Sequence, residues 1–223
     1  MIERFFYKRA AQLFIALVLL LPAVAVRSAN FSFRGTFTRD DNVQLFGFIL
    51  GSPSTVTIRS FGYEGGTNAV GTVIPPGGFD TTVAVYNLLT GSLLGFNDDG
   101  SAPPLVVDPI TGFVGDSLLN LSLGAGTYAV ALTEFDNVPN GNFSAGFFEQ
   151  GKGNFTPGLT GCSAPAFCAA SLNAPGFSLR NGNWALDLLG VTAIASEPGS
   201  FMMFALGLGA LGLFSQRKKF RLE

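Results

Sequence analysis

Short runs of β-forming residues, separated by turn signals, constrain this chain more than any other feature. Phe31, Phe33, Gly35 and Phe37 alternate with polar residues, and this period of two is typical of a half-buried strand. No window between residues 30 and 195 has the pattern of an amphipathic helix. The chain is therefore predicted to be all-β, with one antiparallel β-sandwich domain over residues 30–195.

Six further segments are rich in the valine, leucine, tyrosine, phenylalanine and threonine that favour strands. Paired glycines, prolines and Asp/Asn-Gly steps separate them and indicate tight turns. Residues 151–174 lack either pattern and are expected to form an irregular loop. The six expected strands are Val43–Leu50, Thr55–Arg59, Thr82–Leu89, Leu118–Leu123, Thr127–Thr133 and Asn183–Leu189.

The first 25 residues have the three parts of a secretory signal peptide. Three basic residues precede the apolar run Ala10–Leu21, which Pro22 ends. Ala23 and Ala25 then fill the two small positions of a cleavage site, so removal after Ala25 is expected. The apolar run is predicted to be helical before cleavage. An uncleaved membrane anchor is the alternative reading.

The composition of residues 30–195, the body of the protein, argues against several classes of function. Residues 30–195 hold twelve acidic and five basic side chains, a net charge of −7, which argues against binding nucleic acid. The chain has no histidine, which removes the Ser-His-Asp triad and the usual zinc ligands. Paired carboxylates remain as a catalytic set. Carboxylates exposed in a hairpin keep ordinary pKa values, however, so we expect no enzymatic activity.

Two cysteines lie close together inside the irregular segment. Cys162 and Cys168 are separated by five residues, which is not the spacing of a redox motif. In an exported protein such a pair most simply forms a disulfide across a short loop. The sequence therefore predicts that this bridge pins the loop over residues 151–174, with a stabilisation of about 2 kcal/mol.

The end of the chain combines an apolar run with a basic cluster. Phe201–Phe214 contains only apolar residues and glycine. As a helix it would be about 21 Å long, short of the roughly 30 Å hydrocarbon core of a bilayer. The basic residues that follow this run would hold the C-terminus in the cytoplasm and leave residues 30–195 outside. We therefore expect a transient membrane stop, with Glu197 and Pro198 at the outer face and a basic cluster of Arg217, Lys218, Lys219 and Arg221.

This tail, residues 196–223, resembles the PEP-CTERM sorting signal of bacterial exosortase substrates. The usual motif begins Pro-Glu-Pro, and here Ser196 stands in the first position before Glu197-Pro198. The resemblance implies that an exosortase-type enzyme recognises Glu197-Pro198 and removes the tail. It also implies a cell-surface or extracellular protein associated with exopolysaccharide or biofilm. A plain C-terminal membrane anchor is the alternative.

Part of the body resembles the pre-peptidase C-terminal (PPC-like) β-sandwich domains of bacteria. The resemblance rests on the acidic segment Phe37–Phe46, on Gly77–Gly100 with its Asn97-Asp98-Asp99-Gly100 turn, and on the strand Leu121–Val130. It spans about residues 31–132, with a final strand at 184–189. It implies a jelly-roll type of sandwich, and in some such domains acidic loop residues bind calcium.

The acidic turns make calcium binding chemically reasonable. Calcium takes six to eight oxygen ligands, several of them carboxylates. Aspartate, asparagine and glycine also simply favour turns, which is the plainer reading. The candidate ligands are Asp40, Asp41, Asp80, Asp98 and Asp99.

The sequence thus predicts an exported, non-catalytic surface or matrix protein. A calcium-dependent carbohydrate-binding or adhesion module is the first alternative, and a glycan-processing enzyme that uses paired carboxylates is the second. The expected partners are an exosortase-type enzyme, the membrane during sorting, and polysaccharide.

Overall fold

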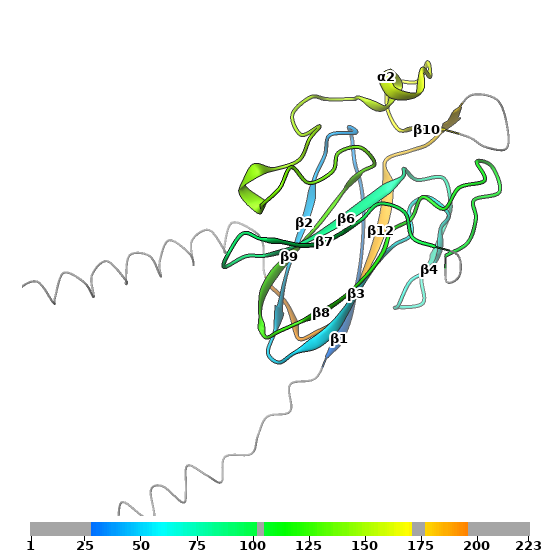
Figure 1. Ribbon diagram of the computed structural model, residues 1–223. Coiled ribbons are helices and arrows are strands. Elements are labelled where there is room, and N and C mark those ends of the chain that lie inside the picture. The colour runs from blue at the N-terminus through cyan, green and yellow to red at the C-terminus, as the bar shows by residue number, and fades with distance from the viewer. Residues whose placement is uncertain (1–27, 102–104, 171–176, 196–223) are drawn as a thin grey trace, which may run out of the picture.

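Two antiparallel sheets form a sandwich in the computed structural model, which describes residues 28–101, 105–170 and 177–195 (Figure 1). One sheet has four strands in the order β1-β12-β3-β8, and the other has five in the order β13-β2-β9-β6-β7. The prediction of an all-β antiparallel fold is confirmed. The expected signal-peptide helix and the C-terminal hydrophobic helix lie outside the described residues.

The four-stranded sheet contains β1 (Ala29–Thr36), β12 (Asn183–Val191), β3 (Ser54–Ser60) and β8 (Leu118–Leu123). The five-stranded sheet contains β13 (Ala193–Ala195), β2 (Gln44–Leu50), β9 (Gly126–Glu134), β6 (Thr81–Asn87) and β7 (Leu93–Asn97). Two short hairpins pair β4 (Gly66–Thr67) with β5 (Val73–Ile74) and β10 (Cys168–Ala170) with β11 (Phe177–Leu179). The helical turns are the 3₁₀ turn η1 (Phe143–Ala145) and α2 (Thr156–Thr160).

The core lies between the sheets and follows from the alternation in the sequence. Because side chains alternate across a strand, every second residue of β6, β9 and β12 points inward. Val83 and Val85 of β6 face Leu186 and Leu188 of β12 in one cluster of fully buried side chains. Each such side chain contributes about 1.5–3 kcal/mol by leaving water. The strand predicted from alternation and the six predicted from β-forming composition are all present, as β1, β2, β3, β6, β8, β9 and β12.

The short strand β7 closes one side of the sandwich. It was not among the strands predicted from the sequence. Its edge meets β8 of the opposite sheet, where Gly95 lies against the side chain of Leu121. A Cβ at position 95 would come within 2.9 Å of that leucine, so glycine permits the close approach. β7 also determines where the turn after it, which carries Asp98 and Asp99, meets the rest of the fold.

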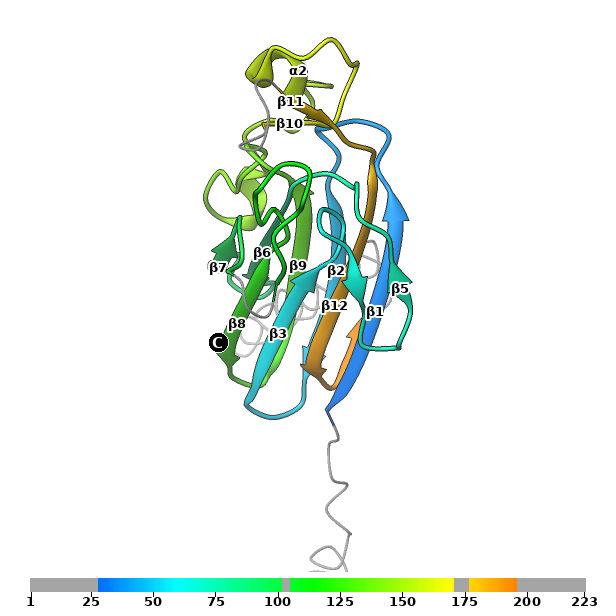
Figure 2. The same ribbon diagram turned by 90° about the vertical axis from the view of Figure 1, so that its right-hand side faces the viewer.

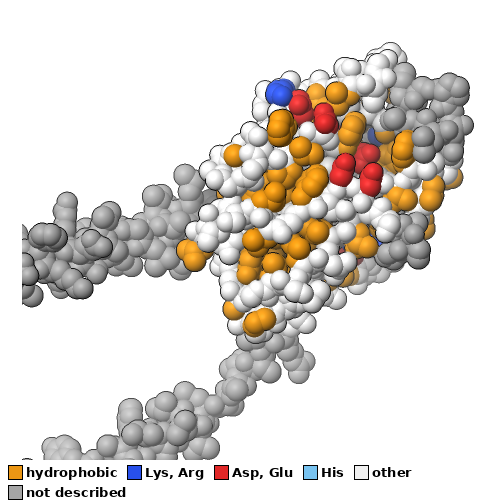
Figure 3. Space-filling view, viewed as in Figure 1, with side chains coloured by type: hydrophobic (Ala, Val, Ile, Leu, Met, Phe, Trp, Pro, Cys, Tyr) orange, Lys and Arg blue, Asp and Glu red, His pale blue; other side chains and the backbone are white. Residues whose placement is uncertain are grey.

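Apolar side chains cover part of the outer face of the five-stranded sheet (Figure 3). Tyr86 of β6 is buried there beneath Phe143 and Phe147, with ring centroids 5.3 and 6.4 Å away. Leu94 and Phe96 of β7 continue this apolar surface and are 38 % exposed. The segment around η1 therefore covers one part of the sheet and leaves another part in contact with solvent.

Candidate metal centre and sorting signal

Three strand ends bring acidic residues together at one end of the five-stranded sheet. Asp80 directly precedes β6, whereas Asp98 and Asp99 directly follow β7. These two strands are antiparallel neighbours, with Val83 opposite Asn97, so the start of one meets the end of the other. β9 pairs with the other side of β6 and ends there as well.

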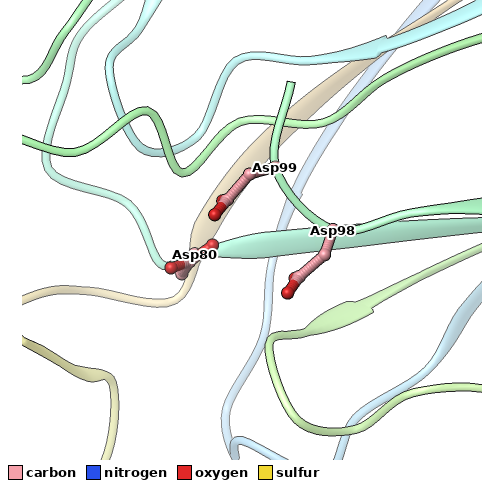
Figure 4. Close-up of side chains that lie close together, drawn as sticks. All are labelled: Asp80, Asp98 and Asp99. Carbon is pink, nitrogen blue, oxygen red and sulfur yellow. The ribbon is translucent and has the colours of Figure 1, made fainter. Parts of the chain in front are cut away.

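The three aspartates form a compact cluster. One carboxylate oxygen from each of Asp80, Asp98 and Asp99 lies within 4.8 Å of the others. Their side chains point toward one another from β6 and from the turn after β7 (Figure 4). The hydroxyl of Ser117 lies within hydrogen-bond distance of the carbonyl oxygens of Thr81, Asn97 and Asp98, at 2.6, 2.9 and 2.5 Å, and so links this turn to the start of β6. The cluster is therefore built on strand ends rather than on a free loop.

Burial and mutual repulsion perturb these carboxyl groups. Burial raises the pKa of Asp80 well above its usual value, and the charges of Asp99 and Asp98 raise it further. Burial, with the charges of Asp99 and Asp136, raises the pKa of Asp98 to about 6. Burial also raises the pKa of Asp99. The expectation that the hairpin carboxylates keep ordinary pKa values is therefore wrong, because this end of the sandwich partly encloses them.

A further acid lies beside the cluster that sequence patterns did not reveal. Glu134 ends β9 opposite Thr81 and is 1 % exposed. Burial raises its pKa well above the usual value, and the charges of Asp80 and Asp40 add to this effect. Nothing in the local sequence marks Glu134 as a site residue, because its place depends on the pairing of β9 with β6.

The cluster fits a hard divalent cation. Among the described residues, Asp80 Oδ1, Asp98 Oδ1 and Glu134 Oε2 are buried without a hydrogen-bond partner. A buried carboxylate oxygen without a donor is costly, and a bound cation would remove that cost. Calcium prefers carboxylate oxygens and tolerates irregular geometry. Asp80, Asp98 and Asp99 would hold the ion, which would compensate their charge.

Asp40 and Asp41 are placed in a different role. Asp40 is fully buried, and both of its carboxylate oxygens accept hydrogen bonds from the segment that follows η1. Asp41 accepts from the Gly153 amide at 2.8 Å and pairs with Arg39 at 3.0 Å. We therefore keep only Asp80, Asp98 and Asp99 as candidate cation ligands.

The Asp40 carboxylate anchors the irregular segment at four points. Oδ2 accepts from the amides of Phe155 and Thr156 and from the Thr156 hydroxyl, at 3.0, 2.8 and 2.7 Å. Oδ1 accepts from the Phe167 amide at 2.8 Å. Phe167 has a φ of 53°, a left-handed conformation that is strained for a residue with a side chain. The predicted disulfide between Cys162 and Cys168 is present, and Asp40 holds the same segment at Phe167, directly before Cys168.

Glu64, in the turn after β3, and Asp116, just before β8, form a second buried acidic pair. Asp116 Oδ1 accepts from the amides of Gly62 and Tyr63, and Oδ2 accepts from that of Glu64. Burial raises the pKa of Glu64 to about 9, and its hydrogen bond to the Asp116 side chain adds to this effect. Glu64 therefore carries a proton at neutral pH, and its Oε1 accepts from the Asp116 amide at 3.3 Å.

Replacement of Glu64 by glutamine should change how stability depends on pH. A carboxyl group whose pKa is raised on folding binds more protons in the native state than in the unfolded state. Its contribution to stability is therefore complete below pH 4.5 and is lost as pH rises toward about 9. Glutamine keeps the donor and does not titrate. We expect the difference in free energy of unfolding between Glu64→Gln and the wild type to grow with pH, by up to about 1.4 kcal/mol per unit.

Urea unfolding at a series of pH values measures this difference. Glu149→Gln is the matched control, because Glu149 only pairs with Lys152 at 3.1 Å and should leave the profile unchanged. Parallel profiles for Glu64→Gln and the wild type would contradict the assignment of a raised pKa to Glu64.

The remaining predicted residues belong to the chain ends. Ala23 and Ala25 of the signal cleavage site lie outside the described residues. So do Glu197, Pro198 and the basic residues Arg217, Lys218, Lys219 and Arg221 of the tail. No helix within the described ranges has the length and apolar character needed to cross a membrane.

Comparison with known protein families identifies the C-terminal segment. The profile of the PEP-CTERM protein-sorting motif matches residues 195–219. The match begins at the end of β13 and includes Glu197-Pro198, the apolar run and the first three basic residues of the cluster. A search of curated proteins gave no match.

These observations define an exported all-β protein that is associated with the cell surface and sorted by a C-terminal signal. The chain carries the PEP-CTERM sorting motif at residues 195–219, and this motif implies processing by exosortase. The predicted sorting signal is thereby confirmed.

Proposed function

We propose that this protein is a non-catalytic component of the cell surface or extracellular matrix. The sorting motif at residues 195–219 carries the proposal, because it couples export to processing near the membrane. In this account the signal peptide of residues 1–25 is removed during export. The tail stops in the membrane, exosortase acts at Glu197-Pro198, and the sandwich then associates with exopolysaccharide or biofilm.

The arrangement of the described residues supports a non-catalytic role. Three carboxylate oxygens of the acidic cluster lie within 4.8 Å of one another, which suits shared coordination of one cation and leaves no room for the water of an inverting glycosidase. A cavity of about 400 Å³ has none of the three aspartates and no other carboxylate in its lining. A glycan-processing enzyme would need paired carboxylates inside the cavity that receives its substrate.

A sorting experiment in the native cells tests the main proposal. The double variant Glu197→Ala, Pro198→Ala should keep its tail and accumulate in membranes, while the wild type reaches the surface or the medium without it. Ser196→Ala is the matched control, because Ser196 already departs from the usual first proline. Unchanged processing of the double variant would contradict recognition at Glu197-Pro198.

A calcium-dependent module for adhesion or carbohydrate binding is the second candidate. The cluster of Asp80, Asp98 and Asp99, with its unpartnered buried oxygens, favours it. Binding of the native polysaccharide should then be lost in chelator and restored by calcium, whereas binding that is unchanged in chelator would count against this candidate.

A further inference from the structure

A cavity of about 400 Å³ lies on the outer face of the four-stranded sheet, and none of the three clustered aspartates lines it. Its floor contains Arg34 and Thr36 of β1 with Asn183 and Ala185 of β12. Val73 and Ile74 of β5, with the prolines and Gly78 that follow, form its wall, and Figure 2 shows β5 beside β1. The volume is within the range of about 300–1,000 Å³ that is typical of small-ligand sites.

Hydrogen-bond donors dominate the polar part of this cavity. The side-chain oxygen of Asn181 accepts from the Asn183 amide at 2.9 Å. The side-chain oxygen of Asn183 accepts from the Thr36 hydroxyl at 2.8 Å. Because both oxygens are engaged within the protein, the two NH₂ groups remain available as donors. Both asparagines are exposed, so a ligand can reach these groups.

Arg34 adds a positive charge that has no ion-pair partner among the residues that the structure describes. Three of the five basic side chains between residues 30 and 195 are paired: Arg39 with Asp41, Lys152 with Glu149 and Arg180 with Asp108. Arg59 lies over the ring of Phe61 at 4.5 Å. Arg34 makes no hydrogen bond, ion pair or ring contact with the residues that the structure describes, and no carboxylate lines its cavity. In a body with a net charge of −7, this is a local donor-rich, positively charged site.

The wall opposite these donors is apolar. Val73 is 74 % exposed, and Pro75 and Pro76 continue the surface beside it. A small inorganic anion would leave this wall in water. A sugar ring instead presents C–H groups to an apolar surface and hydroxyl groups to polar side chains.

We propose that this cavity binds a carboxylate-bearing sugar unit, a uronate, of an extracellular polysaccharide. The Arg34 guanidinium receives the carboxylate in a bidentate pair. The NH₂ groups of Asn181 and Asn183 donate to ring or hydroxyl oxygens, and the sugar's C–H face packs on Val73 and the prolines. The choice of a saccharide rests on the proposed matrix function, whereas the preference for an anion rests on the lining itself.

Isothermal titration of the full-length chain in neutral detergent tests the proposal. The probes are short oligomers of galacturonate, glucuronate and guluronate, without added calcium, each compared with its uncharged methyl ester. We expect at least one acid oligomer to bind and its ester to bind about tenfold or more weakly. Arg34→Ala should cause a similar loss, with partial recovery in Arg34→Lys, since lysine keeps the charge without the planar fork.

Arg39→Ala is the matched control, because it removes one exposed arginine outside the cavity, where it pairs with the buried Asp41. Equal losses in Arg34→Ala and Arg39→Ala, equal binding of acid and ester, or no binding of any acid oligomer would each overturn the proposal. A failure of the cavity proposal can be distinguished from a failure of the proposed function by following removal of the tail from Arg34→Ala in the native cells. If the tail is removed normally while no uronate binds, the sorting account stands and the cavity assignment does not.

Discussion

Calcium should raise the melting temperature of the full-length chain by roughly 5–10 °C when the free ion is at a hundredfold excess over its Kd. The ion binds the folded state, in which Asp80, Asp98 and Asp99 converge, and the unfolded chain has no such cluster. It also compensates oxygens of Asp80 and Asp98 that are buried without partners. Differential scanning calorimetry with calcium and with chelator measures the shift.

The variant Asp80→Asn tests the site further, because it should keep or raise the melting temperature without calcium and remove most of the increase that calcium causes. Without calcium it removes a buried, poorly compensated acid, so its melting temperature should equal or exceed that of the wild type. With calcium it should show little further increase. Glu149→Gln removes one acid outside the cluster and should keep the full calcium-induced shift. A calcium-induced shift that survives in Asp80→Asn would contradict the site.

Replacement of Asp40 by alanine should destabilise the protein by about 4 kcal/mol, the largest effect expected of a single substitution outside the core. It removes the acceptor for the amides of Phe155, Thr156 and Phe167 and for the Thr156 hydroxyl. It also removes the contact that holds Phe167 in its strained conformation. Urea unfolding measures the loss.

A local effect and a global effect can be told apart by limited proteolysis. If only the segment of residues 151–170 opens, cleavage should become faster there while the sandwich keeps its midpoint of unfolding. Asp40→Asn keeps one acceptor oxygen and should lie between alanine and the wild type. Stability and cleavage that are both unchanged in Asp40→Ala would show that the four hydrogen bonds contribute nothing.

One alternating segment, six short runs of β-forming residues and the turn signals between them were sufficient to predict an all-β antiparallel fold. Its seven long strands correspond to β1, β2, β3, β6, β8, β9 and β12. The short strands escaped because two or three residues carry no period, and β7 is positioned by its contact with β8 rather than by its own pattern. The order of strands in each sheet depends on pairing between strands that are far apart in the sequence, and local patterns do not reveal it.

The candidate site likewise depends on contacts between distant segments, which local sequence does not reveal. Composition and turn chemistry selected five aspartates, but they could not divide Asp40 and Asp41, which hold a loop, from Asp80, Asp98 and Asp99, which cluster. Glu134 joins them only because β9 pairs with β6. The sorting signal was readable in full, since its order of Glu-Pro, apolar run and basic cluster is contained in one continuous segment.

The intact mass of the protein from its own cells, taken separately from membranes and medium, tests the central claim most directly. We predict a mass at the surface or in the medium that lacks residues 1–25 and the segment that follows Glu197-Pro198. A mass that retains Phe201–Glu223, found in membranes alone, would contradict processing and make the protein a tethered surface module.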